Sequence, residues 1–138
     1  MKLHHLGLTL VAFAFVIAPQ APVTAVAQGK GDYQARLISP RPGQVVVPGQ
    51  VVRIEWTAAF PNVDLSMCET EVLLSLDGGK TVYMLLRELR DPKVQYIDWT
   101  VPNAPSNQAV LDIRFGCLNL YPESSSLQST FVIAPAAK

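Results

Sequence analysis

The strongest constraint on this chain is a period-two alternation of apolar and polar residues. From Ala109 to Cys117 the odd-numbered residues are all apolar, whereas Asp112, Arg114 and Gly116 lie between them. Successive side chains of a β-strand point to opposite faces of its sheet. The pattern therefore predicts a strand with one face in a hydrophobic core.

Similar segments recur along the chain and end at Pro, Gly, Asn or Asp. Because these residues favour turns, and proline cannot complete a sheet ladder, each segment is predicted to be a separate strand. About seven strands and no strong amphipathic helix indicate an all-β sandwich of two antiparallel sheets. The expected core is the set of apolar residues on the inward side of these strands: Val52, Ile54, Trp56, Val72, Leu74, Ile97, Trp99, Leu111, Ile113 and Phe131.

The middle of the chain is predicted to be a hairpin. A strand-like run over residues 69–76 precedes the turn Asp77-Gly78-Gly79, and a second run covers residues 81–86. Glycine accepts the positive φ angles that a tight turn needs, and an Asp carboxylate there accepts hydrogen bonds from N–H groups of the turn. A helical turn over residues 85–90 is the alternative, since Leu, Arg and Glu favour helices.

The N-terminal segment has the organisation of a secretory signal peptide. Lys2 precedes an apolar run over residues 6–18, and a small-residue region ends in Ala25-Val26-Ala27. This order predicts export with cleavage after Ala27, which leaves no membrane span in the chain. The alternative, an uncleaved anchor, requires about 20 consecutive apolar residues.

The rest of the chain is predicted to be one domain with short flanks. Residues 28–34 are polar and contain glycine, so we expect a flexible lead-in. Residues 35–134 form the expected sandwich, which is long enough to bury a core. Residues 135–138 are expected to be a frayed tail.

Composition argues against several classes of function. The chain has 11 basic and 11 acidic residues, and loss of Lys2 with the leader leaves ten basic residues and a formal charge of −1. Nucleic acid binding depends on a clustered basic face, so no nucleic acid partner is expected. His4 and His5 both precede the cleavage position. The predicted mature chain therefore has no histidine for catalytic triads or metal sites, and no cofactor or metal is expected.

Acidic residues are the remaining candidates for chemistry. Glu69 and Glu71 lie two apart on one predicted strand and so share a face. A carboxylate pair can serve glycoside hydrolysis, but the favoured interpretation is a solvated outer face. Asp64, Asp77 and Asp91 lie in predicted loops without the spacing of a calcium-binding loop, so we assign them to turns.

Five short motifs occur in order along the predicted domain: Pro-x-x-Gly; Gly-x-x-Val-x-Ile-x-Trp over residues 49–56; Leu-Ser-x-Asp-Gly-Gly-x-Thr over 74–81; Trp-Thr-Val-Pro over 99–102; and Phe-x-Ile over 131–133. Together they resemble the immunoglobulin-like, fibronectin type III-like modules of secreted bacterial proteins. The third motif also resembles the Asp-box of sialidase-type propellers. Only one copy exists, and Val82 replaces the aromatic residue of that box, so we interpret it as turn chemistry.

The resemblance implies which strands carry the two cysteines. In an immunoglobulin-like sandwich the third and second-to-last strands are antiparallel neighbours in one sheet. Cys68 begins the one and Cys117 ends the other, and an exported chain favours their oxidation, so a Cys68–Cys117 disulfide is predicted. Opposed residue numbers then sum to 185, which pairs Val72 with Ile113, Leu74 with Leu111 and Glu71 with Arg114.

Modules of this kind serve as spacers, adhesion units or binding domains, so the family likeness names no ligand. The expected function is a secreted or periplasmic, non-enzymatic module for binding, adhesion or structure, with a protein or carbohydrate of the cell envelope as partner. Tyr96 and Tyr121 are the candidate aromatic binding surface. The alternative is a small periplasmic enzyme or inhibitor that uses loop carboxylates.

The leader makes one prediction that a mass measurement decides. We expect the exported protein to begin at Gln28, because Ala25 and Ala27 provide the small residues of a cleavage site. Intact-mass spectrometry of the protein recovered outside the cytoplasm should give the mass of residues 28–138. A recovered protein that still carries Met1 would contradict the cleavage.

Overall fold

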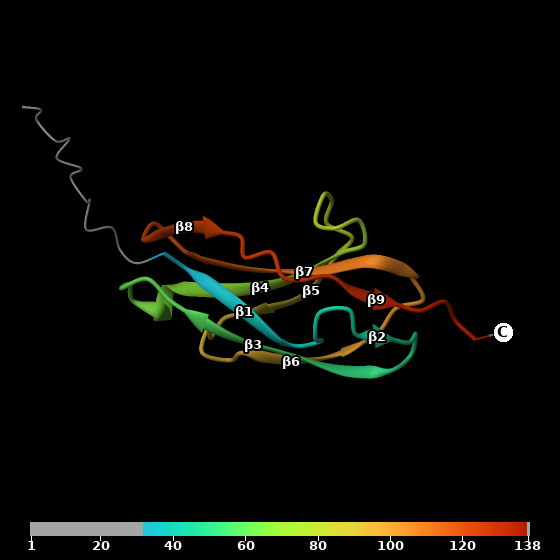
Figure 1. The fold of residues 1–138 in the computed structure, drawn as a ribbon. Helices are drawn as coiled ribbons and strands as arrows, with labels where there is room; N and C mark the ends of the chain where they lie inside the picture. The colour runs from blue at the N-terminus through green and yellow to red at the C-terminus, as the bar shows by residue number, and fades with distance from the viewer. Residues whose placement is uncertain (1–31, 138) are drawn as a thin grey trace, which may run out of the picture.

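The computed structural model describes residues 32–137, which form two β-sheets packed face to face (Figure 1). The predicted signal peptide, residues 1–27, lies outside the described residues. Within residues 32–137 there is no helix with the length and apolar character needed to cross a membrane. The elements are β1 (Gln34–Ser39), β2 (Val45–Val46), β3 (Val51–Ala59), a 3-10 turn η1 (Leu65–Met67), β4 (Cys68–Ser75), β5 (Met84–Leu89), β6 (Tyr96–Thr100), β7 (Ser106–Cys117), β8 (Tyr121–Ser124) and β9 (Phe131–Ile133).

The strands are distributed between a narrow and a wide sheet. The narrow sheet has the order β1-β3-β6, and the wide sheet has the order β2-β9-β7-β4-β5, with β8 also paired to β7. β2 runs parallel to β9, and the other pairs are antiparallel. The chain leaves the narrow sheet after β1, at the cis Ser39–Pro40 peptide bond, and then joins the wide sheet. The predicted all-β fold of two sheets is confirmed.

The core lies between the sheets, and all ten residues predicted for it are buried. They come from β3 and β6 of the narrow sheet and from β4, β7 and β9 of the wide one, and they form one contiguous cluster. Trp56 is only 1% exposed, and the ring of Trp99 meets that of Phe131 edge to face with centroids 6.3 Å apart. Period-two alternation therefore predicted the buried face of each of these strands.

The pairing of β4 with β7 agrees with the predicted register throughout. Cys68 lies opposite Cys117, and the opposed pairs predicted from them, Val72 with Ile113, Leu74 with Leu111 and Glu71 with Arg114, are all present. The Cys68–Cys117 disulfide is formed, with 3.9 Å between the two Cα atoms. The N–H of Leu118 donates to the carbonyl of Met67 at 3.1 Å, which makes the next pair hydrogen-bonded. The cysteines therefore occupy a position without mutual hydrogen bonds, where strands approach most closely.

The second half of the predicted hairpin is different from the expectation. β5 begins at Met84 and continues to Leu89, so the helical turn considered for residues 85–90 is wrong. The residues between Ser75 and Met84 form a loop that rises from the wide sheet (Figure 1), and the N–H of Gly78 donates to the carbonyl of Gln108 on β7. Hydrogen bonds from the N–H and hydroxyl of Thr81 to the Asp77 carboxylate close this loop and delay the return strand.

Three further features were not expected from the sequence. β8 forms between Cys117 and Ser125, where no strand was predicted. Leu73, which the strand period places on the outer face of the wide sheet, is buried with its outer-face neighbour Asp112. The domain also begins earlier than predicted, because Tyr33 is buried and its ring stacks on Phe115 at 5.0 Å. The last residues of the expected lead-in are therefore part of the folded domain.

Removal of the Trp56 side chain should cost about 3 to 5 kcal/mol of the free energy of unfolding, because a large core ring would be replaced by a cavity. Trp56→Ala tests this by urea denaturation. Val51→Ala on the same strand is the matched control: Val51 is 65% exposed, so its loss should change stability by about 0.5 kcal/mol or less. Equal destabilisation by the two variants would contradict the assigned phase of β3.

Candidate functional site

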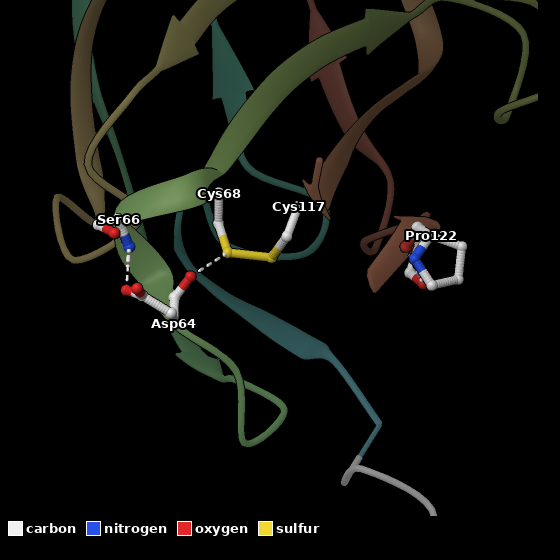
Figure 2. Close-up of a disulfide and its surroundings, with 6 residues drawn as sticks. Asp64, Ser66, Cys68, Cys117 and Pro122 are labelled. Atoms are coloured by element: carbon white, nitrogen blue, oxygen red, sulfur yellow. Dashed lines mark hydrogen bonds between the residues drawn. A yellow bond between two sulfur atoms is a disulfide. The ribbon is translucent and has the colours of Figure 1, made fainter. Parts of the chain in front are cut away.

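An open hollow of about 810 Å³ lies on the outer face of the wide sheet, at its disulfide end. Its floor comes from the start of β4 and the end of β7, and its walls come from η1 and the turn between β7 and β8. Figure 2 shows the Cys68–Cys117 bond that joins the two floor strands at this end. The hollow is thus fixed to the most constrained part of the sheet.

The rim of the hollow is apolar. Leu118, Asn119 and Leu120 form a tight turn, in which the N–H of Leu120 donates to the carbonyl of Cys117 at 3.1 Å. Asn119 has a φ of 57°, a left-handed conformation that Asn adopts more readily than most residues. Leu118 is 68% exposed, and Met67 and Leu120 are also exposed. We call Met67, Leu118 and Leu120 the apolar rim.

The floor of the hollow is charged and centred on Arg114. Its Nε donates to Oδ2 of Asp112 at 2.7 Å, and its NH1 donates to Oε1 of Glu123 at 3.1 Å. Glu71 lies opposite Arg114, as the predicted register requires. The ion pairs of Arg114, however, are made with Asp112 and Glu123 and not with Glu71. Asp112 and Glu123 have taken the two donor sides of the guanidinium that face them.

Glu71 is therefore an acid without its expected counter-charge. Its carboxyl is partly buried in the floor, and burial raises the pKa, with smaller contributions in the same direction from Glu123 and Glu69. Arg114 opposes this shift only in part. Glu69 is exposed as predicted, whereas Glu71 is half-buried and is not on a simple solvated face.

The turn before Cys68 supports the other side of the hollow. Oδ1 of Asp64 accepts from the N–H of Ser66 at 3.0 Å, and this bond lowers the pKa of the Asp64 carboxyl (Figure 2). Sγ of Cys68 lies 3.2 Å from the carbonyl oxygen of Asp64. Because a disulfide sulfur carries no hydrogen, this is a close contact and not a hydrogen bond. Asp64 acts as a turn residue, as the sequence indicated.

The two candidate tyrosines do not form one surface. Tyr121 lines the hollow, but its ring packs 5.7 Å from Phe115 and its hydroxyl accepts from the N–H of Tyr33 at 3.1 Å, so it has a structural role. Tyr96 lies on β6 of the other sheet and is half-exposed. The Arg53 guanidinium covers its ring at 4.6 Å and is itself held by Asp98 at 2.9 Å.

The turn residues Asp77, Gly78 and Gly79 make a closed hydrogen-bond network. Oδ1 of Asp77 accepts from the hydroxyl of Ser75 at 2.7 Å and from the N–H of Thr81 at 2.9 Å, and Oδ2 accepts from the Thr81 hydroxyl at 2.7 Å. Gly78 and Gly79 have φ values of 74° and 90°, which disfavour side chains. A Cβ on Gly79 would also lie 2.7 Å from a methyl group of Leu127.

Sequence reasoning missed the apolar rim. The Leu-Asn-Leu sequence after Cys117 was a usable signal, since two leucines around a turn residue are exposed together.

Among residues 32–137 no group of three His, Cys, Asp or Glu side chains is arranged to hold a metal ion. Neither a protein-family model, a curated protein nor a solved structure matches this chain.

Asp77 gives a pH-dependent prediction. Its hydrogen bonds, first the one from the Thr81 N–H, lower the pKa of the carboxyl to about 2. Stability from these bonds should be complete above the ordinary Asp pKa of about 3.9 and should be lost as the pH falls toward 2. NMR titration of the Asp77 carboxyl carbon measures the midpoint. Thr81→Val removes one of the hydrogen bonds and should raise it, and an ordinary midpoint in the unmodified protein would contradict the network.

Proposed function

We propose that this chain is an exported, non-enzymatic module that binds a protein or carbohydrate of the cell envelope through the hollow at the disulfide end of its wide sheet. The observation that carries the proposal is the composition of this surface: an exposed apolar rim lies beside a charged floor. Clustered exposed apolar residues on a monomer are a common mark of interaction sites. The polar groups of the floor would supply specificity.

The rigidity of the hollow supports the same proposal. The two strands of its floor are joined by the disulfide, which lies on their inner face, and the register of β4 and β7 positions Glu69, Glu71 and Arg114 on the outer face. A preformed site loses less conformational entropy when it binds a partner than a mobile loop does. The apolar rim is held by main-chain hydrogen bonds from Leu118 and Leu120, so it does not need to fold on binding.

The disulfide also supports export. Disulfides persist in oxidising compartments, and they are rare in reducing ones. The Cys68–Cys117 bond therefore fits a periplasmic or extracellular location, together with the leader predicted for residues 1–27.

An immunoglobulin-like topology is part of this proposal. The orders β1-β3-β6 and β9-β7-β4 correspond to the A-B-E and G-F-C orders of that fold. The division of the N-terminal strand between the two sheets, as β1 and β2, supports the same assignment. The disulfide departs from antibody domains, because it joins neighbours in one sheet and does not bridge the two sheets.

Carboxylate catalysis is the alternative, and the raised pKa of Glu71 is the observation in its favour. A glycosidase needs two carboxyl groups on opposite sides of the scissile bond. Glu123 is held in an ion pair by Arg114, and Glu69 lies on the same strand as Glu71, so neither is a free carboxyl group opposite Glu71. Binding is therefore the better interpretation.

Site-specific crosslinking tests the binding surface. A photoreactive amino acid at Leu118, on the apolar rim, should give a discrete adduct with an envelope component when cells are irradiated. The matched control is the same amino acid at Val51, which is 65% exposed against 68% for Leu118 but lies on the narrow sheet. A second variant, Glu69→Lys, should reduce the Leu118 adduct by changing the charge of the floor. Equal adducts from Leu118 and Val51 would contradict the proposal.

A further inference from the structure

The ends of the two sheets differ in how they are protected from pairing with other chains. Unpaired strand edges are templates for intermolecular sheets, and proteins usually block them with charges, prolines, bulges or side-chain contacts. The strand orders of the two sheets described over residues 32–137 end at β1, β6, β2 and β5, and β8, which pairs with β7 outside this order, contains Pro122 and Glu123. Three of these ends are blocked, and the fourth is blocked only in part.

β1 is covered by side chains from the last segment of the chain. The N–H of Ala35 donates to Oγ of Ser126 at 3.1 Å, and the N–H of Leu37 donates to Oε1 of Gln128 at 2.8 Å. The carbonyl of Ala35 accepts from the Ser126 hydroxyl and from Nε2 of Gln128. No strand can pair there without displacing these four bonds.

β2 and β6 are protected by length, proline and charge. β2 has two residues and is followed by Pro48. β6 has Asp98 at its centre, held by Arg53, and ends close to Pro102. A charge in the middle of a short edge strand discourages pairing.

β5 has a protected and an unprotected half. Arg87 and Glu88 carry charge in its second half, and the register with β4 shifts at a bulge between Leu85 and Arg87, where the two halves meet. Its first half and the residues just before it are apolar without interruption from Val82 to Leu86. The N–H of Tyr83 donates to the carbonyl of Leu74 at 2.7 Å, so the chain already runs beside β4 at Tyr83.

This apolar segment is exposed on both faces. Val82 is 49% exposed, Tyr83 51%, Met84 40% and Leu85 48%. Met84 lies opposite the fully buried Leu74 and is exposed nonetheless, because β5 is the end strand of the wider sheet. Within residues 32–137, these four consecutive large apolar residues therefore lie on an open edge of the wide sheet.

We infer that residues 82–86 pair in antiparallel orientation with the same segment of a second copy of this chain. Two residues that lie opposite each other in a sheet point to the same face, and in one strand only residues an even number of positions apart share a face. In a symmetric antiparallel pair of identical strands, the two-fold axis therefore passes between two copies of one residue. With the axis at Met84, Tyr83 meets Leu85 and Val82 meets Leu86, so all five positions oppose apolar residues. With the axis at Leu86, Leu85 would meet Arg87 and Met84 would meet Glu88. The sequence of the edge therefore selects the register centred on Met84.

The interface is small. Five residues on each copy is far fewer than the roughly 20 to 30 residues a side of a standard stable interface, so the dimer forms only at high protein concentration. The protein is purified as cells produce it and studied by sedimentation equilibrium. Its mass should rise toward twice the monomer mass as the concentration approaches about 1 mM. A constant monomer mass over this range would overturn the inference. It would do so even if the same edge were found to bind a different protein.

Charge variants test the location and the register. Leu85→Lys places an ammonium opposite Tyr83 of the second copy and should weaken association at least tenfold, whereas Val51→Lys at an exposed position of the narrow sheet should not. Association of Leu85→Lys at the unmodified level would overturn the proposed edge.

A mixture isolates the register from any folding defect. Tyr83→Glu and Leu85→Lys should each associate weakly alone, but together they should form a heterodimer, because Glu at 83 of one copy then meets Lys at 85 of the other. Failure of the mixture to recover association, with both variants folded by circular dichroism, would overturn the register centred on Met84.

Discussion

The antiparallel pairing of β4 with β7 is the interaction on which the rest of this structure depends. These are the two central strands of the wide sheet, and they are opposed over eight consecutive pairs from Cys68–Cys117 to Ser75–Val110. The disulfide closes a loop with a sequence separation of 49, for which the chain-entropy model gives about 4 kcal/mol of stabilisation. A slip of one residue would turn Val72 and Leu74 out of the core and Glu71 into it. Burial of the apolar face and formation of the disulfide thus specify the same register independently.

The hollow follows from that register. Glu69 lies opposite Gly116, and Glu71 lies opposite Arg114. Gly116 has no side chain, and a Cβ there would approach Cα of Glu123 to 3.2 Å, so the glycine permits β8 to fold close to the floor. β8 in turn carries Glu123 to Arg114, which leaves Glu71 without an ion pair. The electrostatics of the hollow are therefore a consequence of one small residue at the end of β7.

The sequence predicted which residues are buried, but it did not predict which polar side chains contact one another. Val72, Leu74, Leu111 and Ile113 were placed correctly because alternation specifies a face, and the cysteine positions specify a register. Glu71 was placed opposite Arg114 correctly, but which acids form ion pairs with Arg114 depends on how β8 folds back, and no local pattern encodes that. β5 begins later than its apolar run because the Asp77 side chain closes the preceding loop through Thr81. Burial is thus readable from periodicity, whereas contacts between polar side chains are decided by tertiary structure.

The two proposed surfaces reinforce one another geometrically. The hollow lies on the outer face of the wide sheet, whereas the segment proposed for self-association lies on the edge of that same sheet. A two-fold axis that relates antiparallel edge strands is perpendicular to the sheet, so both copies would present their outer faces on the same side. The dimer would then display two hollows toward one partner surface, and a bivalent contact exceeds the affinity of either site when both can be occupied together. In this arrangement the two hollows proposed to bind a partner would act together wherever the protein is concentrated.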